Sequence, residues 1–316
     1  MLYAGRRAEA RQIKLQNRIW RKIKRHWQLY FVVVIPVILL LIFSYGPMYG
    51  LQIAFKDFSA SLGIWESEWV GLKHFETFLT SHQFPRLIKN TLGISLYTLA
   101  AGFPIPIILA ISLNECQNRL YKKTVQMFTY APHFISTVVM AGIILMFLAP
   151  RSGLLNQFIT LFGGTATDFM AEPAYFKSIY VWSGIWQNMG YSSIIYLSAL
   201  SGIDPALHEA ALVDGATKLK RIWHIDLPGI MPTITILLIM ETGRIMSVGY
   251  EKIYLLQNSI NMSASDVIST YVYRLGIEQA QYSFSTAVGL FNSVINCILL
   301  VAVNSFARRF GETSLW

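Results

Sequence analysis

Long runs of uncharged residues are the feature that most limits what this chain can fold into. Five stretches contain no Asp, Glu, Lys or Arg, namely 29–49, 90–113, 124–148, 179–200 and 286–306. Each can cross a hydrocarbon core of about 30 Å as a helix that rises about 1.5 Å per residue. A sixth candidate, 230–250, is interrupted by Glu241 and Arg244. The pattern predicts an all-α integral membrane protein with six transmembrane helices.

The composition agrees with a membrane protein. The 316 residues are 54% hydrophobic and only 14% charged, whereas a soluble chain carries about a quarter charged residues. Buried helices of a globular core are a poor alternative, because the apolar runs are too long and recur too often. The two cysteines, Cys116 and Cys297, fall at different predicted depths, so neither a disulfide nor a metal site is expected.

The distribution of basic residues predicts how the chain is oriented. Six crossings place both termini on one side, and 17 of the 26 Lys and Arg lie on that side, against eight on the other. Cytoplasmic segments are enriched in Lys and Arg, so both termini are expected in the cytoplasm. The net charge of +9 follows from this orientation, and no nucleic acid is expected as a partner.

We expect one membrane domain, at 28–310, with no separate soluble module. A basic arm at 1–27 precedes it and a short tail at 311–316 follows it, both predicted to be cytoplasmic. The arm places Trp20 and Trp27 among basic residues. It is either an amphipathic helix on the anionic surface of the lipid bilayer or a solvated flank that only sets topology.

Prolines and one outer segment predict irregular helices. Pro104 and Pro106 in the second span, and Pro132 in the third, are expected to kink or locally unwind those helices. The outer segment 251–285 contains the stretch Asp266–Tyr273, whose apolar positions are compatible with a return toward the bilayer.

The polar segment 201–229 has the pattern of a small helix outside the bilayer. Asp204 is a suitable N-cap, Pro205 fits the first helical position, and Gly215 is placed to end the helix about ten residues later. Alanines leave part of this helix narrow enough to enter a groove. The segment is therefore predicted to dock on another protein.

No catalytic site is predicted. The chain has no GxxxxGK[ST] motif with which to hold ATP phosphates. It also lacks a Ser/His/Asp, paired-carboxylate or Cys/His set within one predicted compartment. We therefore expect no enzyme activity and no cofactor in this chain, so energy for uphill transport has to come from a partner or an ion gradient.

Polar residues within the spans are the candidates for a solute path. Glu241 and Arg244 share one side of the fifth span because they are spaced i, i+3. Charged groups within a membrane face protein or water. The two residues are therefore either solute contacts or an internal ion pair that fixes helix packing. A flat aromatic and amide cluster in the fourth span suits sugars, and two asparagines form a stripe on the sixth. Hydrogen bonding between helices is the alternative for both groups. These candidates are Trp186, Gln187, Asn188, Tyr191, Glu241, Arg244, Asn292 and Asn296.

The docking segment closely resembles the signature loop of permease subunits in binding-protein-dependent ABC importers. The match is Glu209-Ala-Ala, then Gly215, then Ile225-x-Leu227-Pro228. Further stretches, including Tyr45-Gly-Pro47 and Ser247-Val-Gly-Tyr-Glu-Lys252, resemble a carbohydrate branch that handles oligosaccharides and includes alginate-type importers. The resemblance runs from about residue 25 to the end of the chain.

The resemblance implies a type I permease architecture in a bacterial cytoplasmic (inner) membrane. It implies as partners a second, different permease, two cytoplasmic ATPase subunits that bind ATP and Mg, an extracytoplasmic solute-binding protein and a carbohydrate. Glu209 is expected to pair with a basic residue on the ATPase, and Gly215 to turn the chain. The expected coupling residues are Asp204, Glu209, Ala210, Ala211, Asp214, Gly215, Leu227 and Pro228.

Two other classes of protein remain as alternatives. A gradient-driven secondary transporter is expected to carry carboxylates near helix breaks in the membrane, for which only Glu241 qualifies. A non-transporting assembly scaffold needs no polar path through its spans.

Overall fold

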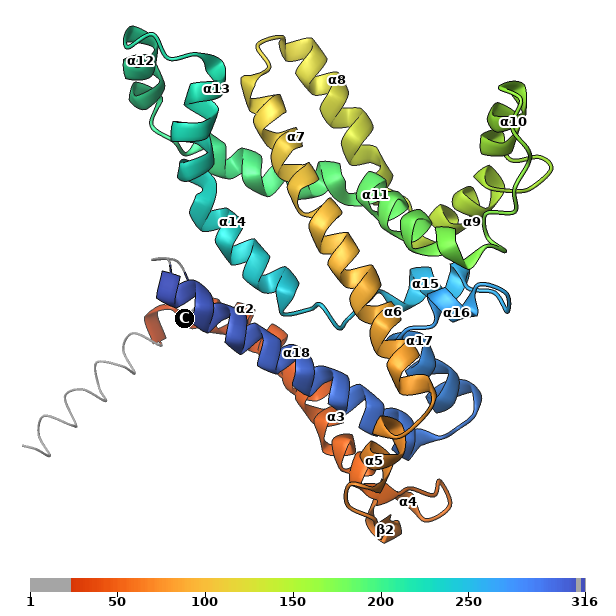
Figure 1. Cartoon of the computed structure of the whole chain (residues 1–316). Coiled ribbons are helices and arrows are strands. Elements are labelled where there is room, and N and C mark those ends of the chain that lie inside the picture. Colours follow the sequence, from red (N-terminus) through yellow and green to blue (C-terminus); the bar gives the residue numbers. More distant parts are fainter. Residues whose placement is uncertain (1–23, 311–313, 316) are drawn as a thin grey trace, which may run out of the picture.

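The computed structural model describes residues 24–310 and 314–315. Most of the predicted basic arm (1–23) and most of the predicted tail (311–313 and 316) therefore lie outside the described residues. The described chain is helical apart from one short antiparallel pair, β1 (Lys56–Asp57) with β2 (Glu68–Trp69). Figure 1 shows an open arrangement of long helices with this pair at one end.

The first half of the chain supplies three long helical segments and short helices between them. The bounds are α2 (Trp27–Leu40), α3 (Gly46–Met48), α4 (Gly63–Glu66), α5 (Lys73–Leu79), α6 (Gln83–Tyr97), α7 (Pro104–Glu115), α8 (Arg119–Tyr130), α9 (Thr137–Phe147) and α10 (Leu154–Leu161). A π-helical turn joins α2 to α3, and another joins α6 to α7 directly before Pro104. The predicted irregularity at Pro104 is therefore present as one widened helical turn, because proline removes a backbone donor at this point.

The second half contains two α-helices of 29 residues each, without a π-helical turn inside them. The bounds are α11 (Pro173–Ser201), α12 (Pro205–Val213), α13 (Lys218–Arg221), α14 (Leu227–Thr242), α15 (Tyr250–Leu256), α16 (Met262–Ser265), α17 (Ile268–Tyr273) and α18 (Tyr282–Phe310). A π-helical turn joins α13 to α14, so that they form one continuous helix. The short helices α15, α16 and α17 lie together near the middle of the molecule, beside the first part of α11 (Figure 1).

Within the described residues, four helices are long and apolar enough to cross a membrane. They are Trp27–Phe55, Gln83–Glu115, Lys218–Thr242 and Tyr282–Arg309. A fifth crossing is counted if the bent pair formed by α8 and α9 is one span. The predicted fourth span forms α11, which is continuous over 29 residues but less apolar than those four helices.

The third predicted span, 124–148, is broken at Pro132, which confirms the irregularity that the sequence predicts there. The segments Arg119–Phe134 and Thr137–Phe147 meet at an angle of 104°. Pro132 lies in a 3₁₀ turn at the break, Ile135 and Ser136 are extended, and the Ser136 hydroxyl accepts from Val139 N to cap α9. Proline and a new N-cap together stop one helix and start another.

The fifth predicted span, 230–250, is displaced from the observed helix. The helix begins at Lys218 and ends at Thr242, so Leu227 and Pro228 lie inside it and not in the loop, and Arg244 lies beyond it. Packing against α18 sets this end, because a Cβ on Gly243 would lie 2.5 Å from a Leu300 methyl carbon. Asn296 on α18 then accepts a hydrogen bond from Met246 N at 3.0 Å and holds the turn that follows.

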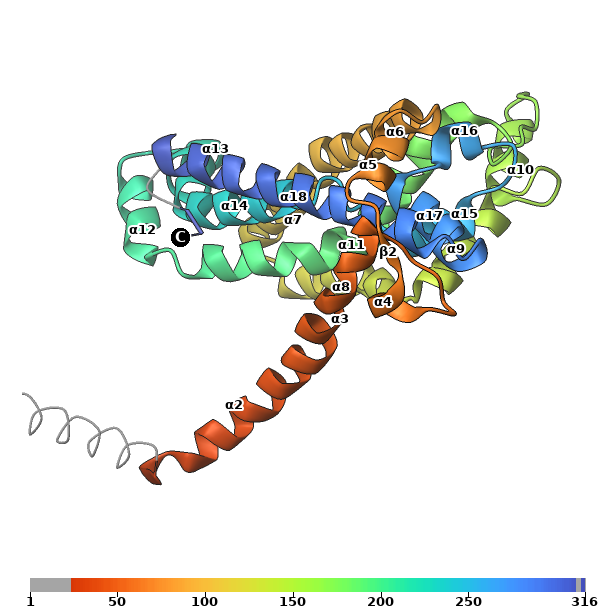
Figure 2. The ribbon, with the colours of Figure 1, turned by 90° about the horizontal axis from the view of Figure 1, so that it is seen from below.

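The first span stands apart from the other helices. Figure 2 shows α2 extending away from the rest of the molecule, and no residue of α2 is buried. Its apolar side chains therefore have no packing partner within the described part of this chain.

An ion cluster links the short helices at the N-terminal end of α6. The carboxylate of Asp266 is fully buried and pairs with Arg274 at 2.9 Å and Arg86 at 3.2 Å. Val267, Ile268 and Thr270 beside it are buried too. The stretch 266–273 is therefore packed against α6 and α18.

Candidate functional sites: a surface helix and a polar cavity

The helix α12 forms as its residue pattern predicts. Asp204 accepts a hydrogen bond from Ala206 N at 2.9 Å, and Pro205 occupies the first turn. At the other end Gly215 has φ +73°, and Ala216 N donates to the Ala211 carbonyl at 2.8 Å. This is the left-handed exit that glycine allows at a helix C-terminus.

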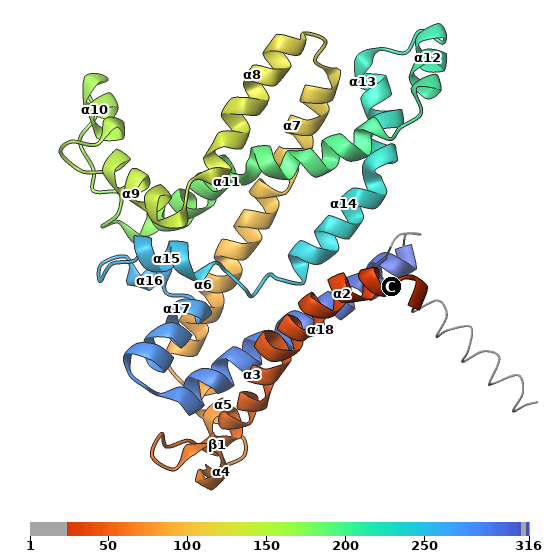
Figure 3. The same ribbon diagram turned by 180° about the vertical axis from the view of Figure 1, so that it is seen from behind.

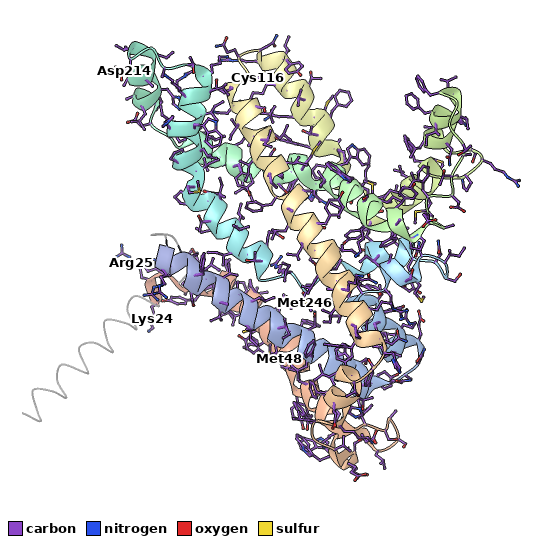
Figure 4. All side chains as sticks on the ribbon, viewed as in Figure 1. Lys24, Arg25, Met48, Cys116, Asp214 and Met246 are labelled. Carbon is purple, nitrogen blue, oxygen red and sulfur yellow. The ribbon has the colours of Figure 1, made fainter. Side chains whose placement is uncertain are left out.

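The surface of α12 combines one acid with exposed apolar side chains. Glu209 is exposed, and no described Lys, Arg or His lies within ion-pair distance of it. Leu207, Leu212 and Val213 are also exposed, Val213 at 88%. Figure 4 labels Asp214 at the end of this helix, on the far side of the molecule from α4 in Figure 1. The helix therefore offers a free carboxylate and apolar groups to a partner.

Charged residues connect α12 to the helix that follows it. His208 Nε2 lies 3.4 Å from Asp226 Oδ1, and Arg221 Nη2 lies 3.8 Å from Glu115 Oε2 at the end of α7. Asp226 is fully buried and neither of its carboxylate oxygens has a hydrogen-bond partner among the described residues. His208 therefore brings α12 into contact with the first part of the Lys218–Thr242 helix.

A cavity of about 470 Å³ lies between α6, α7, α11, α14 and the turn before α15. Figure 4 labels Met246 in that turn, near the centre of the molecule. The wall is mixed, with hydroxyl, amide and charged groups among apolar ones. The polar lining includes Ser95, Thr98, Tyr180, Gln187, Asn188, Ser192, Tyr196, Glu241, Arg244, Ser247 and Lys252.

Half of the residues predicted for a solute path line this cavity. They are Gln187, Asn188, Glu241 and Arg244. Gln187 donates to the Ile135 carbonyl at 3.0 Å, and Asn188 Oδ1 lies 3.0 Å from His133 Nδ1. These contacts fix the two amides between α11 and the break that precedes α9.

The two aromatic residues of the predicted cluster do not line the cavity. Trp186 is 44% exposed on another face of α11. Tyr191 stacks on the His133 ring, with the centroids 3.9 Å apart and the planes at 5°. A helix turns about 100° per residue, so four neighbours on α11 cannot all face one cavity.

The two asparagines of α18 do not line the cavity. Asn296 accepts from Met246 N and donates to Ser247 Oγ at 2.8 Å. Asn292 Oδ1 is buried without a hydrogen-bond partner among the described residues. The contacts of Asn296 match the alternative of interhelical hydrogen bonding.

Glu241 and Arg244 do not form the ion pair that was one of their two predicted roles. Among the described residues their side chains are not within 4.0 Å of each other. The backbone of Arg244 instead donates to the Glu241 carbonyl at 3.1 Å, as the helix ends. Both side chains line the cavity as separate charges.

Sequence reasoning missed Lys252, which is buried in the cavity wall at 8% exposure. The charge distribution predicts Lys252 on the side opposite the termini, because it follows the predicted fifth span. Burial lowers the pKa of this ammonium to about 8. The available signal was the run of apolar neighbours on its own helix, Ile253, Leu255 and Leu256, which is unusual beside a solvated lysine.

Comparison with known proteins identifies the family. Residues 102–312 match the inner membrane component of binding-protein-dependent transport systems. Protein LplB of Bacillus subtilis (strain 168) is 41% identical over 294 residues, 93% of this chain and 92% of LplB. The polygalacturonan/rhamnogalacturonan transport system permease protein YteP of the same organism is 42% identical over 301 residues, 95% of this chain and 94% of YteP.

A solved structure agrees in fold as well as in sequence. The bacterial alginate ABC transporter in complex with an alginate pentasaccharide-bound periplasmic protein contains a chain that matches with a TM-score of 0.86 and 43% identity. The match covers 94% of this chain and 100% of that chain. The chain described here therefore belongs to the family of inner membrane components of binding-protein-dependent transport systems, which are permeases of ABC importers.

Proposed function

We propose that this chain is the transmembrane permease subunit of an ATP-driven oligosaccharide importer and forms half of its translocation path. The observation that carries the proposal is the pairing of two features in one chain. A polar cavity lies between its membrane helices, and a capped surface helix with a free carboxylate lies at one end of them. A transport subunit driven from outside its own chain needs both.

The names of the relatives support a carbohydrate as the solute. YteP is named for transport of polygalacturonan and rhamnogalacturonan, and the matched structure imports alginate. The cavity supports the same class of solute, because hydroxyl and amide groups on its wall can exchange hydrogen bonds with sugar hydroxyls.

The coupling residues act through α12. Glu209 pairs with a basic residue of a cytoplasmic ATPase subunit, and Gly215 gives the helix its exit turn. Two such ATPase subunits bind ATP and Mg, and their closure moves α12. The remaining residues of the proposed coupling segment support this helix or the base of the next one, namely Asp204, Ala210, Ala211, Asp214, Leu227 and Pro228.

The full assembly contains partners on both sides of a bacterial inner membrane. The chain crosses the membrane six times, with α11 and the bent pair of α8 and α9 as two of the crossings, and both termini are cytoplasmic. A second, different permease packs against the chain, and the unpaired face of α2 is available to it. An extracytoplasmic solute-binding protein delivers the sugar at the end that carries α4.

Glu209→Ala tests the coupling role in the reconstituted importer. The variant should insert normally but lose most sugar-stimulated ATP hydrolysis and release the ATPase subunits in detergent, because the docking helix loses its charge anchor. Glu66→Ala is the matched control, since Glu66 is an exposed acid at the opposite end of the molecule. Normal sugar-stimulated ATP hydrolysis by Glu209→Ala would show that Glu209 does not couple this chain to the ATPase.

The energy source separates this proposal from a gradient-driven transporter. Proteoliposomes that contain the assembly should import sugar only when ATP is present on the side of the membrane that carries the ATPase subunits. An imposed proton or sodium gradient should not change the uptake. Uptake driven by a gradient without ATP would favour the alternative, in which Glu241 is the carboxylate of the cavity.

Cysteine labelling tests the orientation. Single cysteines at Ser61 and Thr165, both exposed, should react with an impermeant maleimide in intact cells or spheroplasts. A cysteine at the exposed Ser201 should react only after the membrane is opened. The reverse pattern would overturn the orientation inferred from the distribution of Lys and Arg.

A further inference from the structure

Lys252 is a buried ammonium in the wall of the central cavity. It lies on α15, where Ile253 and Leu256 beside it are fully buried. Its Nζ donates to the Tyr180 carbonyl on α11 at 3.2 Å and lies 5.1 Å from the centre of the Tyr180 ring. These contacts hold the ammonium in one place and use one of its three donors.

No described carboxylate balances this charge. None lies within 4.0 Å of Lys252 Nζ. Burial of an ammonium without a counter-ion is costly, and a methionine of similar length would fill the same space without that cost. The position of Lys252 therefore has a use that packing alone does not explain.

The cavity side of Lys252 is kept clear by a glycine. A Cβ on Gly184 of α11 would lie 3.5 Å from Nζ, and both residues line the cavity. A longer side chain at 184 would cover the ammonium. The charged lining consists of Lys252, Arg244 and Glu241, so positive charge is in excess by one.

We propose that Lys252 determines specificity by binding a carboxylate of an acidic oligosaccharide as it passes through the cavity of this chain. The proposal rests on the proposed function and deepens it by naming a uronic-acid sugar as the solute and one residue as its contact. The two free N–H groups of Lys252 donate to the carboxylate, while the Tyr180 carbonyl and ring hold the ammonium in position.

The test uses the complete importer in proteoliposomes, with two probes of equal length. One is a trisaccharide of uronic acids, and the other is the neutral trisaccharide made by reducing its carboxyl groups. Lys252→Met should lower uptake of the acidic probe about tenfold or more and leave any uptake of the neutral probe unchanged. Lys252→Arg, which keeps the charge, should retain acidic uptake within about threefold.

Lys73→Met is the control for loss of one positive charge. Lys73 is exposed on α5 and pairs only with the exposed Asp57, at 3.2 Å. This variant should import both probes as the wild type does. ATP hydrolysis without sugar should be the same in all variants, which shows that the assemblies are intact.

Thermal unfolding provides a second readout that a purely structural lysine would not give. Without sugar, Lys252→Met should melt several degrees above the wild type, because the buried ammonium is gone. The acidic trisaccharide should raise the melting temperature of the wild type and not that of Lys252→Met.

Three outcomes decide the question. Equal uptake of the acidic probe by Lys252→Met and the wild type would overturn the proposed role of Lys252 and leave the proposed function standing. A lower melting temperature for Lys252→Met would do the same and assign Lys252 to packing on Tyr180. If the wild-type importer takes up neither probe, the proposed function itself fails, and the role of Lys252 falls with it.

Discussion

His208 Nε2 on α12 lies 3.4 Å from Oδ1 of Asp226, which is buried in the π-helical turn before α14. The contact links the helix proposed to meet the ATPase to the helix that lines the cavity. Asp226 has no hydrogen-bond partner among the described residues, and the His208 ring lies within ion-pair distance of it. Figure 3 shows α12 beside α13, which continues into α14.

Removing His208 should take away the ion-pair contact of the buried Asp226 carboxylate. His208→Ala is expected to destabilise the chain by about 1–3 kcal/mol, and Asp226→Asn in the same chain should recover part of that loss. Thermal unfolding of both single variants and the double variant measures the coupling. His224→Ala is the control, because His224 is exposed and contacts only the Lys220 carbonyl, at 2.9 Å. Additive losses would show that the contact carries no energy.

Gly215→Ala should weaken the docking helix through its backbone alone. The residue has φ +73°, and no atom lies within 4 Å of an added Cβ, so the expected cost is the left-handed conformation, about 1 kcal/mol. We expect the Gly215→Ala permease to bind the ATPase subunits several-fold more weakly in a pull-down titration. Gly202→Ala, at a glycine with φ −87°, should bind the ATPase as the wild type does. An equal loss in both variants would show that the left-handed turn at Gly215 is not its cause.

Asp266 should be among the most sensitive positions for stability. Its carboxylate accepts from Arg274 Nη2 at 2.9 and 3.1 Å and from Arg86 Nη2 at 3.2 Å, while fully buried. Asp266→Ala leaves Arg274 without its partner and is expected to cost about 3–5 kcal/mol. The comparison is Asp57→Ala, which breaks an exposed pair and should cost less than about 1 kcal/mol. Similar melting temperatures for the two variants would contradict the ranking.

Arg244 should act on the solute and not through Glu241. The two side chains are not ion-paired, and both line the cavity. Arg244→Lys is therefore expected to reduce uptake of an acidic sugar several-fold, because a point charge replaces a planar fork suited to carboxylates. The double variant Glu241→Gln, Arg244→Gln should not recover what Arg244→Gln loses in an uptake assay. Recovery would identify a packing pair.

The stability cost of Lys252 should depend on pH. Its pKa is lowered to about 8 from 10.5 by burial. Below pH 8 the group is charged in the folded and unfolded chains, so the full cost of burial is present. Between pH 8 and 10.5 only the unfolded chain holds the proton, so stability rises with pH. The melting temperature of Lys252→Met should therefore exceed that of the wild type by less at pH 10 than at pH 7. Arg244, Glu241 and Tyr180 share the cavity but are the same in both proteins, so they cancel in this difference.

The sequence by itself determined the features that depend on near neighbours along the chain. Charge-free runs predicted the apolar helices, because each charged residue within a membrane carries its own free-energy cost. Asp204, Pro205 and Gly215 predicted α12 because caps and turns act within a few residues, and the observed helix, Pro205–Val213, has the predicted ends. The signature spacing in this segment indicated the family that the comparisons identify.

Only the tertiary structure decided where the long helices stop and which polar groups meet. The fifth span ends at Thr242 because α18 approaches Gly243 and Asn296 holds the next turn, and both partners lie about fifty residues away in sequence. That early end moves Arg244 off the helix and brings Lys252 back into the cavity wall. Hydropathy and spacing describe one segment at a time, whereas burial and contact depend on segments that the fold brings together.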